Sequence, residues 1–93
     1  MSPVCRPQAL LLQGRAALLS DRPLKAQRLW NEAAQAAKKL QMPRELGLAL
    51  YEIGRTKSRD DPERSSNLVR AADIFEGVGA QPDLAAVRRA LSV

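Results

Sequence analysis

A chain of 93 residues is long enough for one small domain and too short for two. Its hydrophobic content of 45% exceeds that of a disordered chain, and the lack of histidine excludes histidine-based acid–base catalysis and histidine metal ligands. Because the chain has one Trp, one Tyr and one Phe, its core must be built from leucine and alanine, which favour helices.

The net charge of +5 leaves two classes of partner open, nucleic acid and acidic proteins. Asp and Glu residues are interspersed with the basic residues along most of the chain, which favours basic side chains spread over solvated helix faces. The segment 14–28 offers nucleic acid four cations, Arg15, Arg22, Lys25 and Arg28. However, the chain has no recognition-helix motif and few aromatic side chains for base stacking, so we do not expect a nucleic-acid partner.

The remaining signals of chemistry and location are weak. Cys5 is the only cysteine, so no internal disulfide and no cysteine-based metal site can form within one chain, which fits a reducing compartment. The longest apolar run near the start, residues 9–12, is too short for a signal peptide or a membrane span. We therefore expect a soluble cytoplasmic protein with no membrane partner.

No catalytic residue, metal site or cofactor is expected, and the protein is not expected to be an enzyme. The chain has no glycine-rich phosphate loop, and Gly77 and Gly79 are better explained as a helix stop. The acidic pair Asp60 and Asp61 is expected to cap a helix rather than to bind a metal.

Regularly spaced prolines predict where helices begin. Nearly equal intervals separate Pro23, Pro43, Pro62 and Pro82. Proline is tolerated in the first turn of a helix, and the apolar residues between the prolines recur with a helical period, with no strand-like alternation. The sequence therefore predicts an all-α fold of five antiparallel helices at 8–20, 23–41, 44–58, 62–77 and 83–91. Residues 1–6 are expected to be a flexible segment that precedes a single domain at 7–93.

In chain order, each expected helix carries apolar or small residues at helical spacing. The helix at 8–20 has Leu10, Leu11, Leu12, Leu18 and Leu19, and that at 23–41 has Ala26, Leu29, Trp30, Ala33, Ala36, Ala37 and Leu40. The next has Leu46, Ala49, Leu50 and Ile53, and the helix at 62–77 has Ser65, Leu68, Val69, Ala72 and Phe75. The last has Leu84, Val87 and Leu91. We expect Asp61 to cap the fourth helix, Gly79 to end it, and Lys38 and Lys39 to lie at the end of the second.

Small and large residues recur along the chain with a long period, which indicates an internal repeat. Gly14 and Gly54 lie one period apart, and three further pairs have almost the same spacing: Ala26 with Ser65, Trp30 with Val69, and Ala33 with Ala72. The pairs hold a small, a large and a small residue. This pattern predicts two closely nested helices, with small residues where the backbones approach and Trp30 in the core.

The stretch from Gly14 through Ala26 and Trp30 to Ala33 resembles the tetratricopeptide repeat, in which a small residue of helix A faces small and large residues of helix B. The second unit matches less well, since Lys57 stands where the family has a large apolar residue. Segments such as DDPERSS are similar to the C-terminal helical repeats of large bacterial signalling proteins. The resemblance implies two helical hairpins plus a closing helix in a right-handed superhelical stack. The alternative is a generic helical bundle that self-associates.

The resemblance also implies a protein-interaction module, acting as a regulatory part of a larger signalling protein, whose partner peptide lies on the concave face formed by the helices A. The expected groove residues are Leu11, Arg15, Leu18, Leu48, Tyr51, Arg55, Arg59 and Arg88. Arginines flanked by leucine and tyrosine suit an acidic peptide with apolar anchors. The alternative is that these arginines are solvated and that Tyr51 belongs partly to the core.

Two repeats are fewer than the three or so that stable stacking usually needs. One end of the stack would then remain uncovered and would expose an apolar face. This predicts either a fragment of a longer array or a homo-oligomer that forms through an exposed repeat end.

Overall fold

The computed structural model describes residues 6–92, which form five α-helices joined by short turns, with no strand in that range. The helices are α1 (Arg6–Leu19), α2 (Pro23–Lys39), α3 (Pro43–Arg55), α4 (Pro62–Val78) and α5 (Gln81–Ser92). The all-α prediction with five helices is confirmed. The fold measures 38 × 32 × 19 Å, and its short dimension accommodates two layers of helices.

Most helix ends lie where the sequence predicts them. Pro23, Pro43 and Pro62 are each the first residue of a helix. The Asp61 side chain accepts a hydrogen bond of 2.9 Å from the backbone N–H of Glu63, and Gly79 ends α4 in the left-handed conformation, with φ 71°. These predicted caps are confirmed, as is the placing of two lysines in the last turn of α2.

Four predicted boundaries are wrong by two residues or more. The second helix ends at Lys39 instead of residue 41, and the fifth begins at Gln81 instead of residue 83. The first helix begins at Arg6 instead of residue 8, because Pro7 is tolerated within the first turn and is buried there. Arg6 therefore belongs to α1 rather than to the predicted flexible segment, and Cys5 lies outside the described residues. The third helix ends at Arg55 instead of residue 58, because the side chains of Thr56 and Arg64 bind the carbonyl groups at its end.

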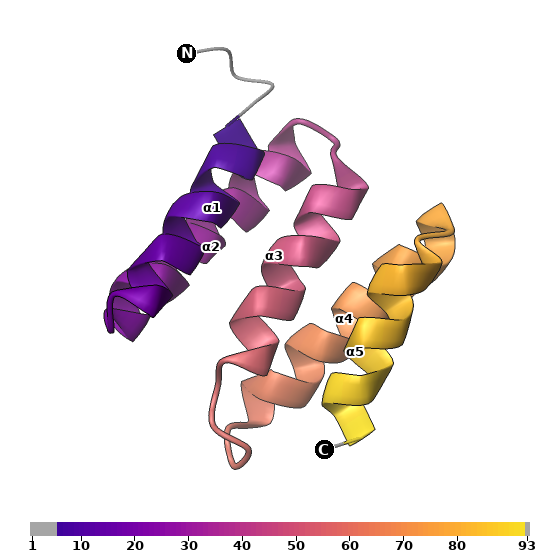
Figure 1. Cartoon of the computed structure of the whole chain (residues 1–93). Coiled ribbons are helices and arrows are strands. Elements are labelled where there is room, and N and C mark those ends of the chain that lie inside the picture. The colour runs from indigo at the N-terminus through magenta and orange to yellow at the C-terminus, as the bar shows by residue number, and fades with distance from the viewer. Residues whose placement is uncertain (1–5, 93) are drawn as a thin grey trace.

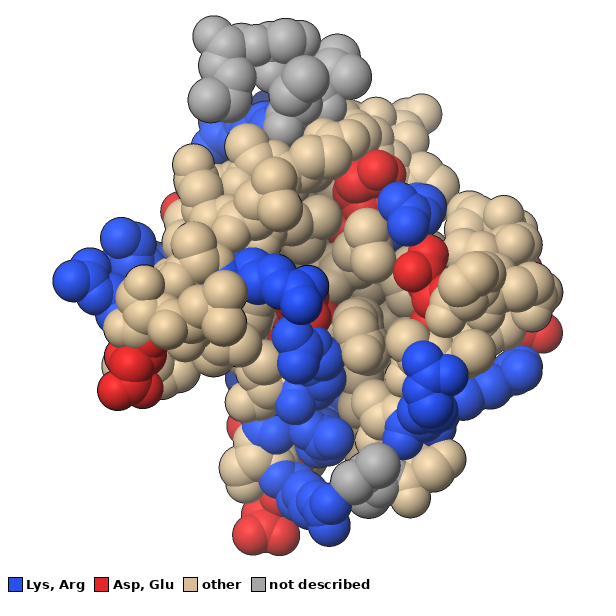
Figure 2. All heavy atoms as spheres, in the orientation of Figure 1, with Lys and Arg blue, Asp and Glu red and all other residues tan. Residues whose placement is uncertain are grey.

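The helices form two layers. In Figure 1, α1, α3 and α5 lie nearer the viewer, and α2 and α4 lie behind them. We call these layers the front face and the back face, and Figure 2 shows the side chains of the front face in the same orientation. Along the front face α1 contacts α3 and α3 contacts α5, whereas α2 and α4 lie apart within the described residues. The helices of the front layer therefore contact one another, whereas in the back layer α2 and α4 leave a gap between them, behind α3.

The first unit is organised around Trp30, which is fully buried. A Cβ atom on Gly14 would lie 2.3 Å from Nε1 of the indole, so only glycine fits at that position. The indole N–H also donates a hydrogen bond of 3.3 Å to the carbonyl oxygen of Leu11. The predicted burial of Trp30 and its contact with a small residue of the preceding helix are confirmed.

The second unit has a different register from the one predicted. The side chain against Gly54 is Leu68, which is 1% exposed, whereas Val69 is 48% exposed. The predicted pairing of Trp30 with Val69 is therefore wrong, as is the pairing of Ala26 with Ser65, which is also exposed. The reason is that α3 ends directly after its glycine, at Arg55, whereas α1 continues from Gly14 to Leu19.

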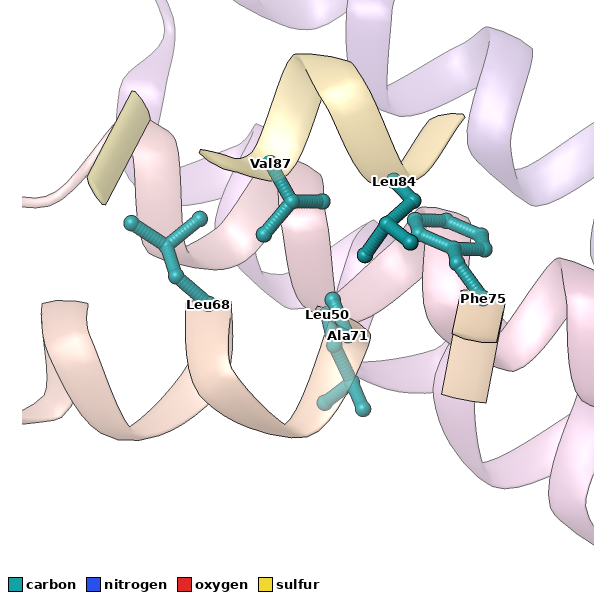
Figure 3. Close-up of a cluster of buried hydrophobic side chains, with 6 residues drawn as sticks. All are labelled: Leu50, Leu68, Ala71, Phe75, Leu84 and Val87. Carbon is teal, nitrogen blue, oxygen red and sulfur yellow. The ribbon is translucent and has the colours of Figure 1, made fainter. Parts of the chain in front are cut away.

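A third cluster joins the last three helices (Figure 3). Its buried members are Leu50 of α3, Leu68, Ala71 and Phe75 of α4, and Leu84 and Val87 of α5. The Phe75 ring lies against Gly47, where a Cβ atom would be 2.7 Å from Cε1. The sequence patterns did not single out Gly47, although it makes the same kind of contact as Gly14. This cluster fixes α5 as the closing helix of the fold.

We expect Gly14→Ala to lower the free energy of unfolding by about 1–3 kcal/mol, because overpacking against Trp30 outweighs the gain of about 1 kcal/mol in helix propensity. Gly77→Ala is the matched control, since a Cβ atom there meets nothing within 4 Å. It should leave stability unchanged or raise it by up to about 1 kcal/mol. Urea denaturation followed by circular dichroism measures both, and equal effects of the two substitutions would contradict the packing of Gly14.

The register of α4 is tested by two adjacent substitutions. Leu68→Ala should cost about 2–5 kcal/mol because it empties a buried site, whereas Val69→Ala should cost under about 1 kcal/mol. The same denaturation experiment decides between the registers: the pairing predicted from the sequence would require the larger loss at Val69.

Candidate functional site

On α1, the structure changes which leucines can meet a partner. Leu11 and Leu18 are half-buried and pack against the cluster that contains Trp30 and Ile53. Their neighbours Leu12 and Leu19 are 70% and 82% exposed. Each lies three or four residues from the exposed Arg15, so the three side chains form one stripe along the helix. Of the predicted groove residues on α1, Arg15 is therefore exposed, whereas Leu11 and Leu18 are only partly accessible to a partner.

On α3, the predicted groove residues are partly enclosed. Leu48 and Tyr51 are half-buried and pack against the cluster shared with α4 and α5. The Arg55 guanidinium lies 5.7 Å from the centre of the Tyr51 ring and forms an ion pair with Glu52, which is 9% exposed. Tyr51 thus belongs partly to the core, and Arg55 remains only partly accessible. The sequence did not identify Glu52 as a partner of Arg55, because Glu52 belongs to no motif or regular spacing that distinguishes it from the other acidic residues.

The Glu52 carboxylate stabilises the charged form of Arg55. By accepting a hydrogen bond from the guanidinium it raises the pKa of Arg55 above its ordinary value, and its negative charge adds to this, while partial burial acts in the opposite direction. Because the ordinary pKa of arginine is already far above neutral, Arg55 stays charged at any pH at which the protein is handled.

Contacts between α1 and α3 show how their side chains align across the front face. The Gln8 amide donates a hydrogen bond of 3.4 Å to the carboxylate of Glu45, a separation of 37 residues. The same offset places Arg15 level with Glu52. Two guanidinium groups, Arg15 and Arg55, and one carboxylate thus belong to the same level of the two helices, which makes this part of the face positive.

The rest of the front face is more evenly charged. Arg44 of α3 forms an ion pair of 3.2 Å with Asp83 of α5. Figure 2 shows acidic and basic side chains mixed over the upper part of the face, whereas basic side chains gather over its lower part. An anionic partner would therefore be attracted to the lower part.

Two predicted groove residues lie elsewhere. Arg59 is exposed in the turn that follows α3 and is not on a helix, because α3 ends at residue 55. Arg88 is exposed on α5, about 140° round the helix axis from Asp83, which faces α3. Arg88 therefore points away from α3 and does not join Arg15 and Arg55.

The early end of α3 is explained by its capping groups. The Thr56 hydroxyl donates to the carbonyl oxygen of Glu52 at 2.6 Å. The guanidinium of Arg64 donates to the carbonyl oxygens of Arg55 at 2.9 Å and Lys57 at 3.0 Å. A cation is favourable at a helix C-terminus, where the last carbonyl groups lack helical partners.

The prediction left open which end of the helix stack exposes an apolar face, and the structure distinguishes the two ends. The outer side of α5 is made of small or polar exposed residues, Ala85, Arg88, Arg89 and Ser92, with Leu91 38% exposed beside them. The most exposed leucines lie instead on the first two helices, at Leu12, Leu19 and Leu24. Helix α5 thus closes its end of the described fold with a largely polar surface.

Comparison with known proteins adds no assignment: the chain matches no protein-family model, no curated protein and no solved structure. Within residues 6–92 there is no group of three or more acidic or cysteine side chains placed to hold a metal ion. None of the five helices described has the length and apolar character needed to cross a membrane.

We expect Arg64→Met to lower the free energy of unfolding by about 1–3 kcal/mol, because the carbonyl groups at the end of α3 lose their donor while the side-chain stem is kept. Arg70→Met is the control, since Arg70 is an exposed arginine of the same helix. Equilibrium denaturation should separate the two variants by at least about 1 kcal/mol. Indistinguishable stabilities would show that solvent replaces Arg64 without loss.

Proposed function

We propose that this chain is a protein-interaction module of the tetratricopeptide type, and that its front face binds an acidic peptide with apolar anchors. The observation that carries the proposal is the stripe on α1, in which two well-exposed leucines flank Arg15. Large apolar side chains with a cation between them offer burial to apolar anchors and a charge-assisted hydrogen bond to a carboxylate.

The neighbouring helix supports this assignment. Arg55 is held over Tyr51 and stays charged, and Glu52 forms its ion pair with Arg55, so Arg15 keeps its charge unbalanced by Glu52. The position of α1 at one edge of the front face leaves the leucine stripe free to meet a partner. The partner expected is a protein segment, and the module would serve as a regulatory part of a larger signalling protein, as the repeat resemblance suggests.

We test the front face with a fluorescein-labelled peptide of about twelve residues that contains glutamates and two leucines. Fluorescence anisotropy should show binding to the wild-type chain that weakens about tenfold or more in Arg15→Glu, because a cation is replaced by an anion facing the ligand. Lys25→Glu, an exposed residue of α2, makes the same change in net charge and should alter the dissociation constant by less than about threefold.

Two further probes separate charge from shape. A peptide with glutamines in place of the glutamates should bind much more weakly, and Leu19→Ser should weaken the acidic peptide without changing its salt dependence. Equal loss in Arg15→Glu and Lys25→Glu would refute the assignment and indicate general attraction to the basic chain. Tighter binding of single-stranded RNA than of the acidic peptide would favour nucleic acid instead.

A further inference from the structure

The back face carries a groove that the proposed function does not use. It runs between α2 and α4, which lie apart, and its floor is formed by three α3 residues, Leu46, Leu50 and Ile53. Its volume is about 210 Å³. This is smaller than the roughly 300–1,000 Å³ typical of small-molecule sites, so a small-molecule ligand is not favoured.

The walls of the groove carry amides and cations. The α2 wall presents Asn31, Gln35 and Lys38, which follow one another at helical spacing, and the α4 wall presents Asn67 and Arg70. No acidic residue lines the groove. The two lining cations therefore make it positive, and the amides give it both hydrogen-bond donors and acceptors.

The two walls are built alike. The Asn31 amide donates to the carbonyl of Gln27 at 2.9 Å, and the Asn67 amide donates to the carbonyl of Glu63 at 2.8 Å, each four residues back. Each bond uses one of the two amide N–H groups and holds the side chain along its helix. The other N–H group and the oxygen of each amide remain as donor and acceptor for a ligand in the groove.

The groove has a direction. The start of α2 meets the end of α3 through Gln27 and Ile53, and the start of α4 meets it through Arg64. In both walls the asparagine therefore lies nearer the end of α3, and the cation lies nearer its beginning. A ligand would meet amides at one end of the groove and positive charge at the other.

We propose that this groove binds an extended, acidic segment of a partner protein, with its main chain held by the amides and a carboxylate held between Lys38 and Arg70. An extended chain has free backbone N–H and C=O groups that side-chain amides can satisfy. A helix satisfies its own backbone groups and, with its side chains, is about 10–12 Å across, so it would use neither the amides nor a groove of this size.

The experiment selects peptides of about twelve residues from a random phage-displayed library on the Arg15→Glu, Leu19→Ser variant, whose front face is disabled. We expect enrichment of peptides that contain Asp or Glu. Anisotropy measurements on the full chain then compare two double variants, Asn31→Ala with Asn67→Ala and Lys38→Gln with Arg70→Gln. The affinity of the selected peptides should fall about tenfold or more in each double variant. N-methylation of the central peptide bonds should weaken binding, because it removes main-chain donors.

Lys25→Glu is the control, and thermal unfolding confirms that each variant is folded. The inference is overturned if no acidic peptide is enriched, or if the selected peptides bind the back-face variants as tightly as the wild-type chain. It is also overturned if N-methylated peptides bind unchanged, which would indicate a helical ligand or a contact through side chains alone. Because the selection bypasses the front face, failure here leaves the proposed function standing, and loss of binding in Arg15→Glu alone would support only that function.

Discussion

The fold depends on the close approach of a glycine on one helix to a large side chain on its neighbour. The contact occurs three times, and in each a Cβ atom on the glycine would lie within 3 Å of the partner: Gly14 with Trp30, Gly47 with Phe75 and Gly54 with Leu68. The glycine always lies on a front-layer helix and the large residue on a back-layer helix. Interiors are close-packed, so these contacts set the separation of the two layers with little freedom. The front and back faces are therefore consequences of the same three contacts.

The second unit differs from the first because α3 ends soon after its glycine. The first inward position of the next helix is Ala26 in the first unit and Arg64 in the second, and the stretch from Gly54 to Arg64 is shorter than that from Gly14 to Ala26. A buried alanine is thus replaced by an arginine whose stem passes over α3 and whose guanidinium reaches three carbonyl groups at its end. The same guanidinium is 3.5 Å from the carbonyl oxygen of Ala90 in α5. Arg64 therefore links the end of α3 to the closing helix. The second unit departs from the sequence pattern of the first because its helices are packed around this arginine and not around a buried alanine.

Sequence patterns predicted the starts of the second, third and fourth helices, the caps and the burial of Trp30, because prolines, capping residues and a lone tryptophan act locally or have few alternatives. They failed where two adjacent apolar residues compete for one inward position. Leu68 and Val69 differ by only about 100° on a helix, as do Leu11 and Leu12, and only the contact with a distant helix decides between them. The left-handed backbone conformation of Gln41, with φ 56°, could not be predicted from the sequence either, since glycine or asparagine is the usual signal for that conformation.

Pairing within the fold decides which charges of the front face remain for a partner. Arg44 and Arg55 already bind carboxylates of the same chain, and a partner that displaced those carboxylates would gain little, because one ion pair would replace another. Arg15 has no ion pair among residues 6–92, and the two leucines beside it exclude water from whatever covers them. A carboxylate placed on Arg15 would therefore form a new interaction in a partly dehydrated setting, where electrostatic attraction is stronger than in bulk water. For this reason the edge helix α1, more than the centre of the face, is where charge and apolar burial reinforce each other.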